Sequence, residues 1–465
     1  MAAGRAPPGS VLPSVRALAA ELGVATGTVA AAYRLLAGRG IVEGHRRAGT
    51  RVRRPVDVRR RGTAVPLGLR DLATGNPDPA HLPDLGQALT KATATNGAER
   101  GPCGLLAEPA GPPAKVVQPT SLPVTPPASP SVNAPTSSTG GRLYGGAAVL
   151  PALESWARRS FEADGIILEG LTVASGALDA VQRALEVHLR PGARVAVEDP
   201  GYAGLLDLLG VLGLVAEPVR VDADGMVATA LGTALARGAQ AVVLTPRAQN
   251  PTGAALTPAR ARALQDVCRR APDVLVVEDD HAGPVSGAPA VTVVGGSSGR
   301  GRRVVVVRSF SKSLGPDLRL AMVAADLHTV AAIEARQSVG AGWVSHLLQA
   351  TALALVSDPR VTADLVRTGE MYSERREALL ARLDDLGTTA TGRSGLNVWV
   401  PVADEDRVVA GMAARGWAVA AGSRYRVASP PAVRVTTATL GADVAPSVAA
   451  DLVASLAPTG HNRAG

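Results

Sequence analysis

The sequence predicts an α/β protein in which a winged helix-turn-helix head precedes a larger domain built on a mainly parallel sheet. The first observation is that residues 1–62 carry 12 arginines against three acidic residues and show helix-turn-helix spacing. The second is that, from Leu143 onward, short apolar runs alternate with amphipathic stretches. This alternation is typical of parallel strands joined by helices. With 465 residues, the chain is long enough for more than one domain.

The head begins with two predicted helices. Pro13 and Ser14 can start the first helix, Gly23 can end it, and the second begins near Thr26. Two strand-like runs in IVEGHRRAGTRV, separated by a basic turn, predict a wing. A solvated basic tail is the alternative, but such a tail needs no folded pattern.

In a winged helix-turn-helix, the second helix enters the major groove and the wing contacts the DNA backbone. The strong positive charge of the head also favours binding to double-stranded DNA. The expected DNA-contacting residues are Thr26, Thr28 and Tyr33 on or beside the second helix and Arg46, Arg47 and Arg51 on the wing.

The stretch from Leu12 to Val52 resembles the GntR family of bacterial transcription regulators, whose pattern is LPSxRxLAxxLGVxxxTVxxAYxxLxxxG followed by a glycine-rich wing. The chain departs from this pattern in two places. The segment before Leu12 is too short for the family's first helix, which we expect to be truncated, and Gly27 stands where arginine is common. A generic helical pair is the alternative. We assign residues 1–54 to this domain and 55–70, which are charged, to a linker.

The rest of the chain, residues 71–460, is assigned to the α/β domain. Its predicted strands end in polar or glycine-containing turns, and functional residues of such sheets lie at strand ends. The strand segments are LTVAS, RVAVE, AVVLT, VLVVED and RVVVVRS. Residues 101–141 are rich in Pro, Ser and Thr, which predicts a disordered insert.

The composition favours a soluble cytoplasmic protein. No apolar run is long enough to span a bilayer, and the N-terminal segment has no hydrophobic signal core. Cys103 and Cys268 are too few for a disulfide framework, and the seven histidines show no metal-ligand spacing. We therefore expect neither a metal site nor a membrane partner.

Lys312 is unusual because the chain has 45 arginines and only three lysines. Lys91 and Lys115 lie in or beside polar, proline-rich sequence, whereas Lys312 follows the apolar run RVVVV. A lysine that loses its proton can form a Schiff base with an aldehyde, but an arginine cannot. The position therefore indicates a need for an amine, although a leftover surface lysine is the alternative.

Three earlier strand ends suit a flat, phosphorylated ligand. In the turn Ser175-Gly176-Ala177, glycine permits close approach and the N–H groups at a helix start suit a phosphate. Tyr202 could stack on a ring, although a core tyrosine is the default interpretation. Asn250 lies in a turn that Pro251 stiffens and Gly253 opens, and an ordinary turn is the alternative.

Two later strand ends add charged and hydroxyl groups. The run VLVVEDD ends in three acids, and Asp279 would be explained by a cationic partner such as a protonated pyridine nitrogen. A solvated turn is equally compatible. Ser309, Ser311 and Arg319 flank Lys312 and could hold a phosphate beside an aldehyde.

The order of these motifs resembles the fold-type I aminotransferases that bind pyridoxal 5′-phosphate, whose domain carries a smaller C-terminal α+β subdomain. The resemblance implies that Lys312 forms a Schiff base with this cofactor and that Asp279 pairs with the pyridine nitrogen. It further implies that Asn250 bonds the ring hydroxyl and that Tyr202 stacks on the ring. The residues implied at the phosphate are Ser175, Gly176, Ala177, Ser309 and Arg319.

Three further residues enter through this resemblance. Arg434 in PAVRVTTATL corresponds to the arginine that binds a substrate carboxylate. Tyr144 in RLYGG corresponds to the tyrosine that reaches the neighbouring subunit's phosphate, which implies a homodimer. His281 replaces a family tyrosine and could donate a similar bond to the ring hydroxyl.

A GntR-type head fused to an aminotransferase-like body resembles the MocR subfamily. This implies a regulator that binds an operator and senses an amino acid, an amine or pyridoxal 5′-phosphate itself. The alternative is an active aminotransferase with a vestigial head, and a third interpretation is a DNA-binding protein with an empty body. The basic head favours a regulator whose body senses an effector rather than acting as an enzyme, and an empty body would not need Lys312, Asp279 and Asn250 in this order.

Overall fold

The computed structural model describes residues 9–38, 42–45, 49–52, 65–98, 144–294 and 302–456. The insert predicted at 101–141, the wing residues Arg46 and Arg47, and residues 55–64 of the predicted linker lie outside these ranges. Within the described ranges, no single helix combines the length and apolarity needed to cross a membrane. Only the first two helices taken together, with a bend of 119° between them, meet that test.

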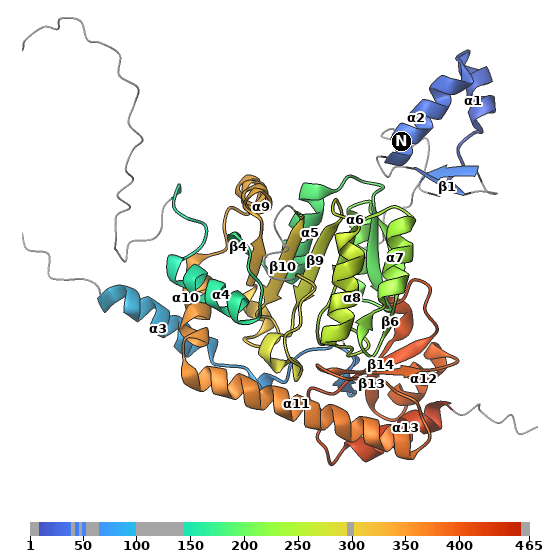
Figure 1. The fold of residues 1–465 in the computed structure, drawn as a ribbon. Coiled ribbons are helices and arrows are strands. Elements are labelled where there is room, and N and C mark those ends of the chain that lie inside the picture. Colours follow the sequence, from blue (N-terminus) through green and yellow to red (C-terminus); the bar gives the residue numbers. More distant parts are fainter. Residues whose placement is uncertain are drawn as a thin grey trace, which may run out of the picture.

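The head contains two helices and an antiparallel strand pair. These are α1 (Val15–Leu22), α2 (Thr26–Gly38), β1 (Val42–His45) and β2 (Gly49–Val52). The Ser14 side chain accepts a hydrogen bond from Ala17 N at 3.1 Å, and Gly23 ends α1 with a φ of 64° that suits glycine. The predicted winged helix-turn-helix is therefore confirmed (Figure 1).

The body is built on an eight-stranded sheet, in which β11 and β7 run antiparallel to their neighbours and the other strands are parallel. In sheet order the strands are β4 (Gly170–Ala174), β11 (Ala321–Ala325), β10 (Val304–Ser309), β9 (Leu275–Asp280), β8 (Ala239–Leu244), β5 (Arg194–Asp199), β6 (Val215–Asp222) and β7 (Gly225–Met226). All five strand segments predicted from the sequence lie in this sheet. The mainly parallel architecture is confirmed.

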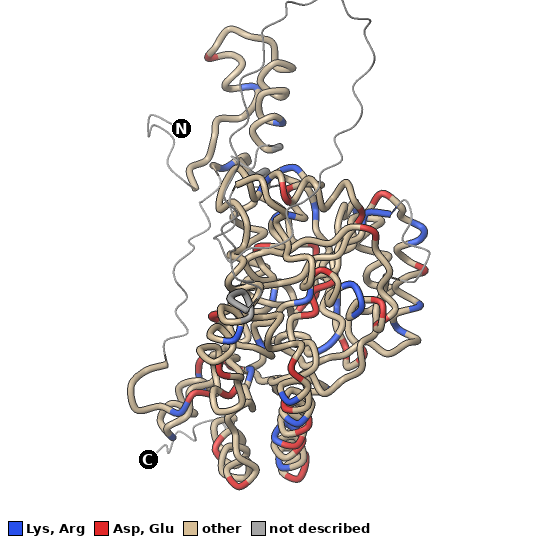
Figure 2. Tube along the Cα trace, turned by 90° about the vertical axis from the view of Figure 1, so that its left-hand side faces the viewer, with Lys and Arg blue, Asp and Glu red and all other residues tan. Residues whose placement is uncertain are grey.

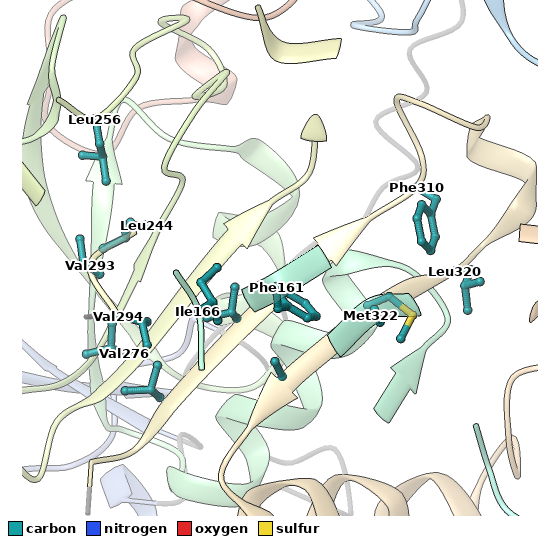
Figure 3. Close-up of a cluster of buried hydrophobic side chains, with 14 of the residues drawn as sticks. Phe161, Ile166, Leu244, Leu256, Val276, Val293, Val294, Phe310, Leu320 and Met322 are labelled. Carbon is teal, nitrogen blue, oxygen red and sulfur yellow. The ribbon is translucent and has the colours of Figure 1, made fainter. Parts of the chain in front are cut away.

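Helices cover both faces of this sheet, because alternate strand residues point to opposite sides. On β10, Val304 and Val306 join one apolar cluster, while Val305 and Val307 join another. The first cluster packs against α4 (Pro151–Ala163), α7 (Ala228–Ala236), α8 (Pro258–Arg269) and α10 (His346–Val356). The second packs against α5 (Ala177–His188), α6 (Ala203–Val211) and α9 (Leu327–Val339). Figure 3 shows part of the first cluster, with Phe161 and Phe310 among its members.

A second, smaller sheet forms the predicted C-terminal subdomain. Its order is β12 (Asn397–Pro401), β14 (Ala432–Thr436), β13 (Trp417–Ala421) and β3 (Arg70–Leu72). Helices α12 (Glu405–Ala413) and α13 (Ala445–Leu456) accompany it, and the long α11 (Pro359–Asp385) connects it with the main body (Figure 1). The strand β3 belongs to the chain before α3 (Leu85–Ala98) and pairs parallel with β13, so the start of the body is part of the C-terminal subdomain.

Short 3-10 turns occur at η1 (Pro79–His81), η2 (Gly283–Ser286), η4 (Pro316–Leu318) and η5 (Gly422–Arg424). Positive and negative residues are interspersed over the body in Figure 2. This agrees with the sequence, which concentrates the net positive charge in the head.

Candidate functional site

Several predicted site residues lie at or just after the C-terminal ends of parallel strands of the main sheet, where loops from neighbouring strands converge. Strands β9 and β10 are direct neighbours, with Asp279 in register with Val307, and Lys312 lies in the turn after β10. Tyr202 follows β5 and lines one small cavity together with Asp279. A cavity of about 680 Å³ between α3 and α11 contains none of the predicted site residues.

Lys312 is half-buried, and its Nζ donates a hydrogen bond to Gly75 O at 2.8 Å. Burial lowers the pKa of Lys312 to about 8, and the positive charge of Arg434 contributes to this shift. A lower pKa increases the fraction of neutral amine near pH 7. The neutral amine is the form that attacks an aldehyde.

Asp279 and Asp280 occupy different environments although they are adjacent on β9. Asp280 is paired with Arg247 through two hydrogen bonds of 2.9 and 2.7 Å, so its charge is balanced within the protein. Among the described residues, the buried Oδ1 of Asp279 has no hydrogen-bond partner. Burial raises the pKa of Asp279 to about 7, and repulsion from Asp280 adds to this effect. A buried acid without a partner is costly, and a cationic or N–H-bearing ligand would satisfy it.

Arg319, in the loop after η4, lies against the turn before α5. Arg319 donates to Ser175 O at 2.8 Å, and an added Cβ at Gly176 would lie 2.9 Å from the same guanidinium. The N–H of Ser175 is engaged with Asp179, so the helix-start donors left for a ligand within the described part of the chain are the N–H groups of Gly176 and Ala177.

The hydroxyl groups of Ser309 and Ser311 lie 3.0 Å apart, in the turn that also carries Lys312. Arg319 follows in the next loop, so one guanidinium and two hydroxyl groups lie close to Lys312 in the sequence. This donor set suits a phosphate group.

Arg434 on β14 is 2% exposed and is held by three groups. It donates to Asn250 Oδ1 at 3.0 Å and to Ala73 O, and its guanidinium lies 4.8 Å from the Tyr425 ring centroid. Burial lowers its pKa. The structure therefore brings Asn250 and Arg434 together, although 184 positions separate them. Burial and the charge of Asp279 raise the pKa of Tyr202, whose surroundings also include Arg434 and Arg319.

His281 and Tyr144 occupy different settings. Burial lowers the pKa of His281 to about 4, with the charge of Lys312 as the next cause, so the imidazole is neutral at pH 7. Tyr144 is 91% exposed, and its ring packs edge-on against Trp343 at 5.3 Å between centroids. Tyr144 is thus accessible to another molecule.

The predicted DNA-contacting residues of the head differ in their exposure and hydrogen bonding. Thr26 and Thr28 are exposed on α2. The Tyr33 hydroxyl instead donates to Pro13 O at 2.8 Å, which ties α2 to the segment before α1. Arg51 donates to Gly9 O at 3.2 Å and remains partly exposed.

Sequence reasoning missed the backbone carbonyls of Ala73 and Gly75, which contact Arg434 and Lys312. A carbonyl has no sequence signal, so these contacts could not be found. It also missed Tyr425, for which a signal existed. The chain has only five tyrosines, so Tyr425, like Lys312, belongs to a residue type that is scarce in this sequence.

Comparisons with known proteins agree with both halves of the fold. Residues 138–451 match the family model for aminotransferase class I and II, and residues 1–52 match that for bacterial regulatory proteins of the gntR family. The solved kynurenine aminotransferase of Pyrococcus horikoshii, in complex with PMP, covers 84% of this chain and 91% of its own with a TM-score of 0.68. At 18% identity this likeness shows the fold alone.

Two relatives share the whole arrangement. The vitamin B6 salvage pathway transcriptional repressor PtsJ of Salmonella typhimurium is 36% identical over 95% of this chain and 92% of its own length. The pyridoxine biosynthesis transcriptional regulator PdxR of Corynebacterium glutamicum is 27% identical over 91% and 86%.

A gntR-type DNA-binding domain joined to an aminotransferase class I and II domain defines a class of bacterial transcription regulators. The chain belongs to this class, the MocR subfamily of GntR-type regulators. The regulator hypothesis is therefore supported over the alternative of an aminotransferase with a vestigial head.

Proposed function

We propose that the protein is a transcription regulator that binds double-stranded DNA through its head and pyridoxal 5′-phosphate in its body. One observation carries the proposal: Lys312, with its pKa lowered to about 8, lies beside a strand whose buried Asp279 Oδ1 has no partner among the described residues. The bound cofactor would supply an aldehyde and an electron-withdrawing ring. The residues present fit it.

Each residue would have a defined task. Lys312 would hold the cofactor covalently, and Asp279 would accept a hydrogen bond from the ring nitrogen. Tyr202 would stack on the ring, and the ring hydroxyl would lie near Asn250 and the neutral His281. The phosphate would be bound by Ser175, Gly176, Ala177, Ser309, Ser311 and Arg319.

We infer that pyridoxal 5′-phosphate is itself the signal, because two relatives that match nearly the whole chain are named for vitamin B6 pathways. The operator would then control genes for making or recovering this vitamin. Arg434 supports a second candidate, an amino acid, because a buried guanidinium beside the cofactor site suits a carboxylate. An effector alters operator affinity only if it binds the two states of the regulator differently.

Removing the guanidinium of Arg319 is expected to weaken cofactor binding roughly 10- to 100-fold, because a charge-assisted bond to phosphate is lost. Equilibrium titration of Arg319→Ala with pyridoxal 5′-phosphate would measure this. Pyridoxal, which lacks the phosphate, is the control ligand and should bind both forms alike. An equal loss for the two ligands would mean that Arg319 only supports the fold.

The protein is expected to form a homodimer, since the exposed Tyr144 would reach the cofactor phosphate of a neighbouring subunit. Sedimentation velocity of the cofactor-loaded protein would measure its mass. A loaded monomer at micromolar concentration would refute the dimer and the role of Tyr144 together.

DNA binding by the head tests the regulator function. Arg51→Gln is expected to weaken binding to every sequence and to lower the salt slope by about one unit, as loss of one phosphate contact does. Thr28→Val, on the exposed face of α2, should instead change sequence preference. The measurement is an electrophoretic mobility shift with DNA from upstream of the protein's own gene, at several salt concentrations. No salt-sensitive complex, together with rapid turnover of amino acids, would favour the aminotransferase instead.

A further inference from the structure

Asp199, at the end of β5, is held by an unusual set of donors. Its Oδ1 accepts from Val427 N at 2.8 Å and Ser429 Oγ at 2.9 Å. Its Oδ2 accepts from Ala428 N at 2.8 Å and Ser429 N at 2.9 Å. The residue is 5% exposed. Four donors from one loop therefore surround a single carboxylate, and we call residues 427–429 the Asp199-bound loop.

This arrangement joins the two subdomains next to the candidate site. Asp199 belongs to the main sheet, whereas the Asp199-bound loop lies between η5 and β14 in the C-terminal subdomain. A second bond crosses the same boundary, since Gly201 N donates to Tyr425 O at 2.7 Å. The connection leaves β5 just before Tyr202.

The Asp199-bound loop also fixes the surroundings of Arg434. Tyr425, two positions before the loop, is 3% exposed, and its ring lies 4.8 Å from the Arg434 guanidinium. The ring is supported in turn by Trp399, edge-on at 6.1 Å between centroids. A cation over an aromatic face is oriented by that face. Tyr425 is thus one of the groups that hold the guanidinium. Tyr425 is itself tied to the main sheet by the bond from Gly201 N and by the adjoining loop, whose donors bond to Asp199.

We propose that Asp199 is a positioning residue for carboxylate recognition. By holding the Asp199-bound loop, it keeps Tyr425 beneath Arg434 and presents the guanidinium to the carboxylate of an amino acid at the cofactor site. Amines that lack a carboxylate do not depend on it. The inference rests on the proposed role of Arg434.

The test uses the full-length protein loaded with pyridoxal 5′-phosphate and follows the cofactor absorption during titration with L-alanine or ethylamine. These probes differ in the carboxylate, so the ratio of their dissociation constants reports carboxylate recognition. In Asp199→Asn, an amide NH₂ group replaces one carboxylate oxygen. This group cannot accept the hydrogen bonds that the oxygen receives from the Asp199-bound loop, so part of the attachment is lost. The variant is expected to bind L-alanine about tenfold more weakly and ethylamine within about twofold of wild type, with unchanged cofactor content.

Three further variants separate positioning from general damage. Tyr425→Leu should reproduce the selective loss, and Tyr425→Phe, which keeps the ring, should not. Asp326→Asn is the matched control. The Asp326 carboxylate also accepts hydrogen bonds from a backbone N–H and a hydroxyl, Thr329 N at 2.9 Å and Thr329 Oγ1 at 2.7 Å, but it caps α9 and does not hold the Asp199-bound loop. It should leave the ratio unchanged.

The outcomes distinguish this inference from the proposed function. If Arg434→Gln leaves the L-alanine to ethylamine ratio unchanged, the role of Arg434 fails and the inference fails with it. If Arg434→Gln removes the preference for L-alanine but Asp199→Asn does not, only the inference is overturned. Equal weakening of both probes by Asp199→Asn would also overturn it, because that pattern indicates a structural role.

Discussion

Replacing Lys312 by arginine is expected to abolish covalent attachment of pyridoxal 5′-phosphate, although the side chain keeps its positive charge. The guanidinium stays protonated and cannot attack the aldehyde, whereas burial lowers the pKa of Lys312 to about 8 and makes its amine available. Borohydride reduction followed by peptide mapping should place the cofactor on Lys312 in the wild-type protein. The variant should carry no label, and its visible absorption band should be lost.

Lys91→Arg is the matched control. Lys91 is exposed and contacts Asp358 at 3.4 Å, so the same chemical change is made on the surface. It should leave labelling unchanged. Label on any other lysine of the wild-type protein, or persistent covalent attachment in the arginine variant, would contradict the assignment.

Asp279→Asn is expected to weaken the binding of pyridoxal 5′-phosphate roughly 10- to 100-fold, because a charge-assisted hydrogen bond to the ring nitrogen becomes a neutral one. The variant has nearly the same shape, so the change acts through charge. Asp273→Asn, at an exposed site before β9, is the matched control. Unchanged affinity in Asp279→Asn would mean that the buried carboxylate does not face the ring.

The difference in stability between the wild type and this variant should depend on pH, because the pKa of Asp279 is raised in the folded wild-type protein. The folded protein binds this proton up to about pH 7, above the unfolded value of about 3.9. The stability that the neutral acid contributes is therefore complete below about pH 4 and is lost as pH rises through about 7. In cofactor-free protein, the stability of Asp279→Asn relative to wild type should increase as pH rises from about 4 to about 7, as urea unfolding would measure. A constant difference across this range would contradict the raised pKa.

The Asp279 carboxyl gives cofactor binding the opposite pH dependence, since binding is favoured at high pH and stability at low pH. The wild-type affinity for pyridoxal 5′-phosphate should fall below about pH 7, because the carboxyl then has to release a proton to pair with a protonated ring nitrogen. The asparagine variant should lack this component of the pH dependence.

The central strands were predictable because continuous apolar runs mark strands buried on both faces. Strand β10, with its run of four valines, is an example. Strand β3 was not predictable, since its three residues pair with β13 almost 350 positions away. Such a short segment has little pattern of its own, and its structure is determined by tertiary contact.

The site was predictable where residue chemistry was specific. Lys312, Asp279 and Arg319 were expected from their types and their order. The structure places Asp279 and Lys312 at or just after the C-terminal ends of the neighbouring strands β9 and β10, and Arg319 at the end of η4. The bond between Arg434 and Asn250 and the four bonds to Asp199 were not predictable, because they join two subdomains. Tyr33 was expected beside the DNA, but its hydroxyl is bonded inside the head, since helical spacing does not show which face packs against Pro13.

The most direct test of coupling between the body and the head is to measure the affinity of the protein for the DNA upstream of its own gene. Fluorescence anisotropy at fixed salt would give this affinity across a range of pyridoxal 5′-phosphate concentrations. We predict that operator affinity changes with the same midpoint as cofactor binding to the body and that Lys312→Arg removes most of this change, because binding at the two sites is coupled. Operator affinity that stays constant from cofactor-free to saturated wild-type protein, with amino acids also without effect, would contradict the claim that the aminotransferase-like body controls the DNA-binding head.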